Sequence, residues 1–193
     1  MQSVCVFAGS KTGASPAYRD AACELGRAVA ARGYTLVYGG GSIGLMGVIA
    51  DAVLADGGRI IGVIPDELAR REVAHAGLTE LKVVRTMHER KALMASLSDA
   101  VIALPGGLGT LDELFEMLTW AQLGIHTKPC GLLNVAGYFD ALLTYLDHTV
   151  TEGFIAAGHR SLLLVDDDAG RLLERMADYR MPPAQPWRGH DIT

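Results

Sequence analysis

The sequence lacks the residue spacings that mark several common functional classes. Its three cysteines are odd in number and have no CxxC spacing, which argues against a disulfide framework and against a cysteine-based zinc site. None of the six histidines stands at HxH or HxxxH spacing, so we expect no metal site. A GxSxG elbow is also missing, and its absence argues against a Ser-His-Asp hydrolase.

Long apolar runs and basic clusters are equally scarce. Charged residues or glycines interrupt every apolar run before the roughly 18 residues that a membrane span needs, so no membrane association is expected. The first residues carry no basic segment, and we expect no signal peptide. With 17 basic residues, 22 acidic residues and a net charge of −5, the chain is not expected to bind nucleic acid. These features indicate a cytoplasmic protein.

The sequence is rich in short apolar runs that alternate with helical patterns from end to end. This alternation predicts an α/β fold in which helices cover both faces of a parallel sheet of about seven strands. The expected strands cover residues 3–8, 35–38, 59–64, 81–84, 100–104, 130–134 and 162–165. The expected helices cover residues 16–32, 45–56, 87–98, 109–123, 138–152 and 168–179.

The length of 193 residues fits one domain with a sizeable core. We expect this domain to cover residues 1–180 and an irregular tail to cover residues 181–193, where three of the seven prolines lie. Residues 66–79 interrupt the alternation. They are expected to form a long loop, with or without a short helix, at a place where substrate lids occur.

Residues 103–113, with the sequence ALPGGLGTLDE, join an expected strand to an amphipathic helix through a glycine turn. The free N–H groups and the dipole of a helix N-terminus favour a phosphate, and glycines let a ligand approach the backbone closely. Glu113 follows one turn into the helix, where it would face the sugar of a nucleotide. A tight connection without a ligand is the alternative reading of the same glycines.

A second glycine loop follows the strand expected at residues 35–38. Gly39, Gly41 and Gly44 form a literal GxGxxG, and Asp66 or Glu67 stands roughly twenty residues further on, as in a dinucleotide-binding fingerprint. That fingerprint normally follows the first strand, so an NAD-dependent oxidoreductase is only an alternative. Ligands of open α/β sheets bind at the carboxyl ends of the strands, and the glycine loops therefore predict one crevice.

Charged residues on two expected helices point to the same crevice. Arg90 and Lys91 stand in the first turn of the helix expected at residues 87–98, where the helix dipole disfavours cations. A phosphate or an acidic residue would compensate them. The alternative is that the two residues simply form an exposed, charged first turn. Glu113 and Glu116 share one helix face. Such a pair suits glycosidic chemistry, in which a carboxylate activates water or stabilises a cationic sugar.

These motifs together resemble the LONELY GUY (LOG) family of cytokinin-activating phosphoribohydrolases, and the likeness runs from about residue 4 to about residue 178. The motifs that carry it are Tyr38-Gly39-Gly40-Gly41, Gly44-Leu45-Met46-Gly47, Met87-His88-Glu89-Arg90-Lys91 and the PGGxGTxxE segment from Pro105 to Glu113. The resemblance implies a homodimer of doubly wound, Rossmann-like catalytic domains. It also implies hydrolysis, without a cofactor, of the N-glycosidic bond of N6-substituted adenosine 5′-monophosphates or of AMP, which releases the base and ribose 5-phosphate.

The resemblance also assigns roles to residues. It makes Glu113 the catalytic carboxylate and Arg90 its catalytic partner. The substrate- and phosphate-binding set that we expect from it consists of Gly106, Gly107, Leu108, Gly109, Thr110, Lys91, Glu72, Thr119, Gly41 and Ser10. Ala8 and Asp112 replace the cysteine and glutamate of many relatives, which affects fine specificity only. A protein that senses AMP without cleaving it would have the same phosphate cradle and is the alternative function.

Overall fold

A seven-stranded parallel sheet is the framework of the computed structural model, which describes residues 1–69 and 74–181. The strand order is β4-β3-β2-β1-β5-β6-β7. The strands are β1 (Ser3–Phe7), β2 (Thr35–Tyr38), β3 (Ile60–Pro65), β4 (Glu80–Val84), β5 (Ala100–Ala103), β6 (Cys130–Leu133) and β7 (Leu163–Asp166). The predicted doubly wound α/β fold and its seven strands are therefore confirmed. All of the expected tail except Met181 lies outside the described residues.

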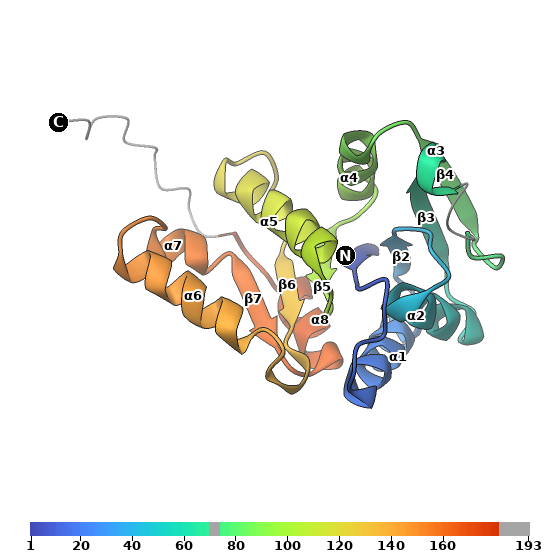
Figure 1. The fold of residues 1–193 in the computed structure, drawn as a ribbon, viewed down its shortest axis with the longest axis horizontal. Coiled ribbons are helices and arrows are strands. Elements are labelled where there is room, and N and C mark those ends of the chain that lie inside the picture. Colours follow the sequence, from blue (N-terminus) through green and yellow to red (C-terminus); the bar gives the residue numbers. More distant parts are fainter. Residues whose placement is uncertain (70–73, 182–193) are drawn as a thin grey trace.

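Helices cover both faces of the sheet, as expected (Figure 1). The six expected helices are α1 (Pro16–Ala31), α2 (Gly44–Ala55), α4 (Met87–Ser96), α5 (Leu108–Gln122), α6 (Asp140–Thr151) and α8 (Ala169–Ala177). Three short elements complete the described part: α3 (Asp66–Ala69), η1 (Val135–Gly137) and α7 (Ala157–Arg160). In Figure 1, α4 and α5 lie above the strands, while α1, α2 and α8 lie below them.

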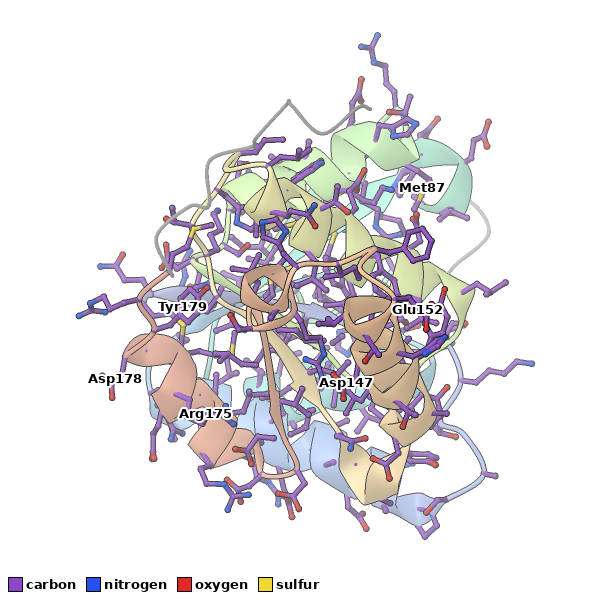
Figure 2. The ribbon with its side chains drawn as sticks, turned by 90° about the vertical axis from the view of Figure 1, so that its left-hand side faces the viewer. Met87, Asp147, Glu152, Arg175, Asp178 and Tyr179 are labelled. Atoms are coloured by element: carbon purple, nitrogen blue, oxygen red, sulfur yellow. The ribbon has the colours of Figure 1, made fainter. Side chains whose placement is uncertain are left out.

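The two faces of the sheet have separate apolar cores because successive side chains of a strand point to opposite faces. On β1, Val4 and Val6 belong to the core beneath α1, α2 and α8, whereas Cys5 and Phe7 belong to the core beneath α4 and α5. A third cluster joins α5 and α6 to the β7 edge. Figure 2 views the molecule from this edge and labels Asp147 of α6 and Arg175 of α8. Both faces of the central strands are thus buried.

The chain reverses its direction across the sheet at β1. It builds β1 to β4 towards one edge, returns to place β5 on the other side of β1, and then builds towards the opposite edge. The loops after β1 and β5 meet at this switch point, where the Gly9 amide donates to the Pro105 carbonyl at 3.1 Å. A Cβ on Gly9 would lie 3.2 Å from the Gly106 Cα. Glycines at both positions let the two loops touch, at the place where open α/β sheets bind ligands.

Candidate active site

A cavity of about 310 Å³ opens at the switch point between β1 and β5. We call it the catalytic crevice. The loop after β1 contributes Ser10, the start of α4 contributes Met87 and Arg90, and the start of α5 contributes the segment from Gly107 to Glu113. Figure 2 labels Met87 near the top of the molecule. The structure therefore brings most of the predicted site residues together in one place.

The N-terminus of α5 opens into the catalytic crevice. Gly107 is its N-cap and provides no side-chain hydrogen bond to the first turn. The first amides of a helix have no partner within the helix, so those of α5 are free to bind an anion. A Cβ on Gly107 or Gly109 would point into open space, which leaves room for a ligand beside the backbone. This is the geometry expected of a phosphate cradle.

Gly106 serves a different purpose from its neighbour. A Cβ at this position would collide with the Thr110 side chain and approach the Gly9 amide at 3.0 Å. The Gly106 carbonyl accepts a hydrogen bond from the Tyr138 hydroxyl at 2.7 Å. Gly106 is therefore required by the packing of the loops, and it shapes the cradle from behind.

The GxGxxG loop does not form a comparable cradle. The Leu45 amide, in the first turn of α2, donates to the Gly9 carbonyl at 2.9 Å. A Cβ on Gly44 would collide with the backbone at Ser10. Because the start of α2 is packed against protein, it offers no space for a pyrophosphate, and this geometry disfavours the dinucleotide alternative. Gly41 forms an isolated antiparallel bridge with Ala74 and does not line the crevice.

Arg90 reaches the crevice from the first turn of α4. The side chain is buried, and its Nε donates to the carbonyl of Val63 in β3 at 3.1 Å. Its Nη1 lies 3.7 Å from Oε1 of Glu113. A Cβ on Gly39, in the loop between β2 and α2, would collide with the guanidinium. Arg90 therefore fills a space that exists because residue 39 is a glycine. Sequence reasoning gave Gly39 no such role.

Glu113 is a buried carboxylate beside the phosphate cradle, with 9% of its surface exposed. Burial raises the pKa of Glu113 to about 7, while the Arg90 charge opposes that rise and the charge of Asp112 adds to it. At neutral pH the carboxyl group is consequently divided between its protonated and ionised forms. A group with such a pKa can exchange a proton with a substrate or a water molecule.

Lys91 does not line the crevice and is held by two carboxylates, of which Asp112 lines the crevice and Glu116 does not. Its Nζ lies 3.1 Å from Oδ2 of Asp112 and 3.0 Å from Oε2 of Glu116. Burial by itself would lower the pKa of Lys91, but these two carboxylates raise it above the ordinary value. A fully charged lysine of this kind does not suit Schiff-base formation with pyridoxal phosphate. The expected compensation of the cations in α4 by acidic residues is thus observed.

The expected pair of carboxylates on α5 is split between the two cations. Glu113 faces Arg90 in the crevice, whereas Glu116 contacts Lys91 and does not line the crevice. Asp112 precedes Glu113 and so points to another side of the helix, but it also reaches Lys91 because a lysine side chain is long and flexible. Of this pair, only Glu113 lines the crevice and is available to a substrate.

Thr119, a further predicted contact, does not line the crevice. Thr119 donates from its hydroxyl to the Phe115 carbonyl at 2.7 Å and lines a separate cavity of about 120 Å³ beside α6 and α7. Glu72 lies outside the described residues. Sequence reasoning missed Met46 and Met87 as lining residues, although both stand within the motifs that it singled out. An apolar methionine gives no chemical signal in a sequence.

The described residues include no group of three or more histidine, cysteine, aspartate or glutamate side chains that could hold a metal ion. The same part of the chain has no helix that is both long and apolar enough to cross a membrane.

Comparison with known proteins relates the chain to one family. A family model described as "Possible lysine decarboxylase" matches residues 46–176. The chain is 54% identical over 176 residues to a probable cytokinin riboside 5′-monophosphate phosphoribohydrolase of Oryza sativa subsp. japonica, covering 91% of this chain and 78% of the relative. It is 53% identical over 176 residues to a cytokinin riboside 5′-monophosphate phosphoribohydrolase of Arabidopsis thaliana, with coverage of 91% and 83%.

Solved structures show the same fold at lower identity. The molybdenum cofactor carrier protein of Chlamydomonas reinhardtii is similar with a TM-score of 0.69 and 22% identity, over 93% of this chain and 100% of that chain. The molybdenum cofactor binding protein of Rippkaea orientalis gives a TM-score of 0.69 and 22% identity, over 92% and 96% of the two chains. Likeness at this level of identity concerns the fold alone.

Proposed function

Because this chain belongs to the LOG family of phosphoribohydrolases, we propose that it hydrolyses the N-glycosidic bond of adenosine 5′-monophosphates, with or without an N6 substituent. The products are the free base and ribose 5-phosphate. The observation that carries this proposal is the position of Glu113, a buried carboxylate with a raised pKa that lines the same crevice as the open N-terminus of α5.

The 5′-phosphate binds at the amides of Gly107 to Thr110. These groups are fixed by the fold before the ligand arrives, so little reorganisation is needed on binding. Because the phosphate is remote from the reacting carbon, its binding energy can be used to position the ribose. The ribose then lies over Glu113, which follows the cradle on the same helix.

The ionised form of Glu113 is the reactive one. As the C1′–N9 bond lengthens, its electron pair leaves with the base and positive charge develops on the ribose, where the carboxylate stabilises it. Glu113 takes a proton from the attacking water as the water oxygen bonds to C1′. The base gains one proton, so that one water molecule is added across the broken bond. Arg90 favours the ionised carboxylate through its positive charge, 3.7 Å away.

We also propose that the protein is a cytoplasmic homodimer that needs neither a cofactor nor a nucleic-acid partner. Cys5, Cys23 and Cys130 are all free thiols, which suits a reducing compartment. Leu123, the C-cap of α5, and Ile125, just after it, are apolar and 63% and 64% exposed. A homodimer would also reconcile the predicted nucleotide contact of Thr119 with its position outside the crevice of its own chain. Sedimentation at micromolar concentration tests the oligomeric state.

Chromatographic detection of the free base tests the enzymatic proposal. We expect release of base from AMP or from isopentenyladenosine monophosphate, and the ratio of the two rates identifies the preferred substrate. In Glu113→Gln we expect kcat to fall by about 10²- to 10⁴-fold. A kcat within about twofold of the wild type would overturn the role of Glu113. If AMP raises the Tm of the wild type but neither nucleotide releases base, the protein is a sensor.

A further inference from the structure

The cations beside the catalytic crevice are already matched by carboxylates. Arg90 faces Glu113, and Lys91 contacts both Asp112 and Glu116. These five side chains carry three potential negative charges against two positive ones. A phosphate monoester adds nearly two more negative charges at neutral pH. The cradle of backbone amides therefore lacks a free cation from this group of side chains.

A second cavity lies next to the crevice and contains such a cation. Its volume is about 390 Å³, and it shares Gly9, Ser10 and Gly107 with the crevice. Lys11 lines this cavity, and its side chain makes no ion pair or hydrogen bond with any residue that the structure describes. Among the described lysines and arginines that line the two cavities, Lys11 is the one without an acidic partner.

The loop that carries Lys11 is held on both sides. At its start, Gly9 donates to the Pro105 carbonyl and accepts from the Leu45 amide at 2.9 Å. At its end, Gly13 has a φ of +76° and packs so closely on Tyr18 that a Cβ would lie 2.6 Å from the ring. Tyr18 in turn packs edge-to-face on Tyr138, with ring centroids 5.5 Å apart. Lys11 therefore extends from an anchored loop.

We propose that Lys11 is the cation that recognises the 5′-phosphate of the substrate and so distinguishes nucleotides from nucleosides. The phosphate at the start of α5 directs its outer oxygens towards the neighbouring cavity, across Gly107 and Ser10, which line both cavities. The Lys11 ammonium donates to these oxygens. The ligand class is a phosphate monoester dianion, such as a nucleoside monophosphate or ribose 5-phosphate. This inference rests on the proposed position of the phosphate.

Steady-state kinetics of Lys11→Met test the inference. Loss of one charge-assisted hydrogen bond should raise KM for AMP about tenfold, while kcat stays within about twofold because the backbone amides of the cradle still hold the phosphate and position the ribose. Lys11→Arg should restore most of the affinity. Lys82→Met is the matched control, since Lys82 pairs with Glu80 on β4, and it should leave KM unchanged. An unchanged KM in Lys11→Met, or a loss in kcat alone, would overturn the inference.

Calorimetric titration with ribose 5-phosphate tests the same inference without catalysis. Lys11→Met should bind ribose 5-phosphate about tenfold more weakly than the wild type. If the wild type releases no base but Lys11→Met still binds ribose 5-phosphate more weakly than the wild type, the proposed reaction fails while the role of Lys11 stands. Equal affinity in the two proteins, or no binding of ribose 5-phosphate to the wild type, would overturn the role of Lys11. Equal Tm values for the two proteins show that the substitution has not disturbed the fold.

Discussion

The β2–α2 loop and the β5–α5 loop are both rich in glycine, and each joins a parallel strand to a helix, yet their surroundings differ. At the start of α2, the Leu45 amide is bonded to Gly9, and a Cβ on Gly44 would meet the backbone of the β1 loop. At the start of α5, a Cβ on Gly107 or Gly109 would meet nothing. A glycine therefore indicates a close approach to its backbone. Its neighbours decide whether protein or a ligand makes that approach.

Alanine substitutions in the two loops test this difference most directly. Gly44→Ala should destabilise the protein by at least about 2 kcal/mol, because Gly44 has a φ of +63° and a Cβ there collides with backbone. Gly107→Ala should change the free energy of unfolding by less than about 1 kcal/mol. Its added methyl group enters the phosphate site, so KM for AMP should rise about tenfold. Denaturant unfolding and steady-state kinetics measure the two effects.

The opposite pattern would contradict the comparison between the loops. A well-folded Gly44→Ala with weakened nucleotide binding would place the ligand at α2. A Gly107→Ala that unfolds but binds normally would show that the β5–α5 loop is a structural connection only.

The open loop adjoins a carboxylate whose burial has a cost that depends on pH. Burial raises the pKa of Glu113 from an ordinary value of 4.5 to about 7. Below its unfolded-state pKa, Glu113 is protonated in both states, so Glu113→Gln and the wild type should be equally stable. As the pH rises through about 7, the wild type loses up to about 3 kcal/mol of stability relative to Glu113→Gln. Denaturant unfolding at about pH 4 and about pH 8 measures this difference.

A difference in stability that does not change between these two pH values would show that Glu113 is not desolvated in the folded protein. Glu174→Gln in α8 is a matched control, because the side chain of Glu174 is 70% exposed, and its stability relative to the wild type should be the same at both pH values.

The β2–α2 loop also affects Glu113, through Arg90, and of the effects predicted here this one should be the smallest. A Cβ on Gly39 collides with the end of the flexible Arg90 side chain, so in Gly39→Ala the guanidinium should move away from Glu113 while the fold is retained. Without that charge the pKa of Glu113 should rise further, by about one unit. The pH profile of kcat/KM, which rises as Glu113 ionises, should shift to higher pH accordingly.

Gly170→Ala in α8 is the control for this experiment, because a Cβ there would meet only the ends of two side chains outside the crevice, Asp168 at 3.3 Å and Arg32 at 3.7 Å. An identical pH profile in Gly39→Ala would mean that Arg90 does not tune Glu113.

The sequence contains enough information to predict the fold but not the pairing of charges in the site. Apolar runs identified the central strands because both of their faces are buried, and they also identified the edge strand β4, although Leu81 and Val83 on it are exposed. Helix α6 starts at Asp140, later than predicted, because the Asn134 side chain accepts from the Phe139 amide at 2.8 Å and donates to Asp140 at 2.7 Å. Such side-chain contacts near a helix start depend on a local turn that residue patterns do not fix.

The pairing of the cations with the carboxylates depends on how α4 and α5 pack. Arg90 and Lys91 are neighbours in sequence, but one reaches Glu113 and the other reaches Asp112 and Glu116. A helical repeat describes one helix at a time, so it predicts that Glu113 and Glu116 share a face and cannot show which cation meets each. The role of Gly39 escaped prediction for the same reason, because it depends on a residue from another element.

The junction of β1 and β5 also has a consequence for the order in which the protein matures. The two strands pair with Val4 opposite Ala100, so the sheet closes at its centre only after a long stretch of chain has been made and folded. The phosphate cradle lies at this seam, and a partly synthesised chain that ends before α5 has no cradle. The ability to bind a nucleotide should therefore appear late in synthesis and in a single step. A nucleotide that binds the finished seam favours the completed fold by mass action.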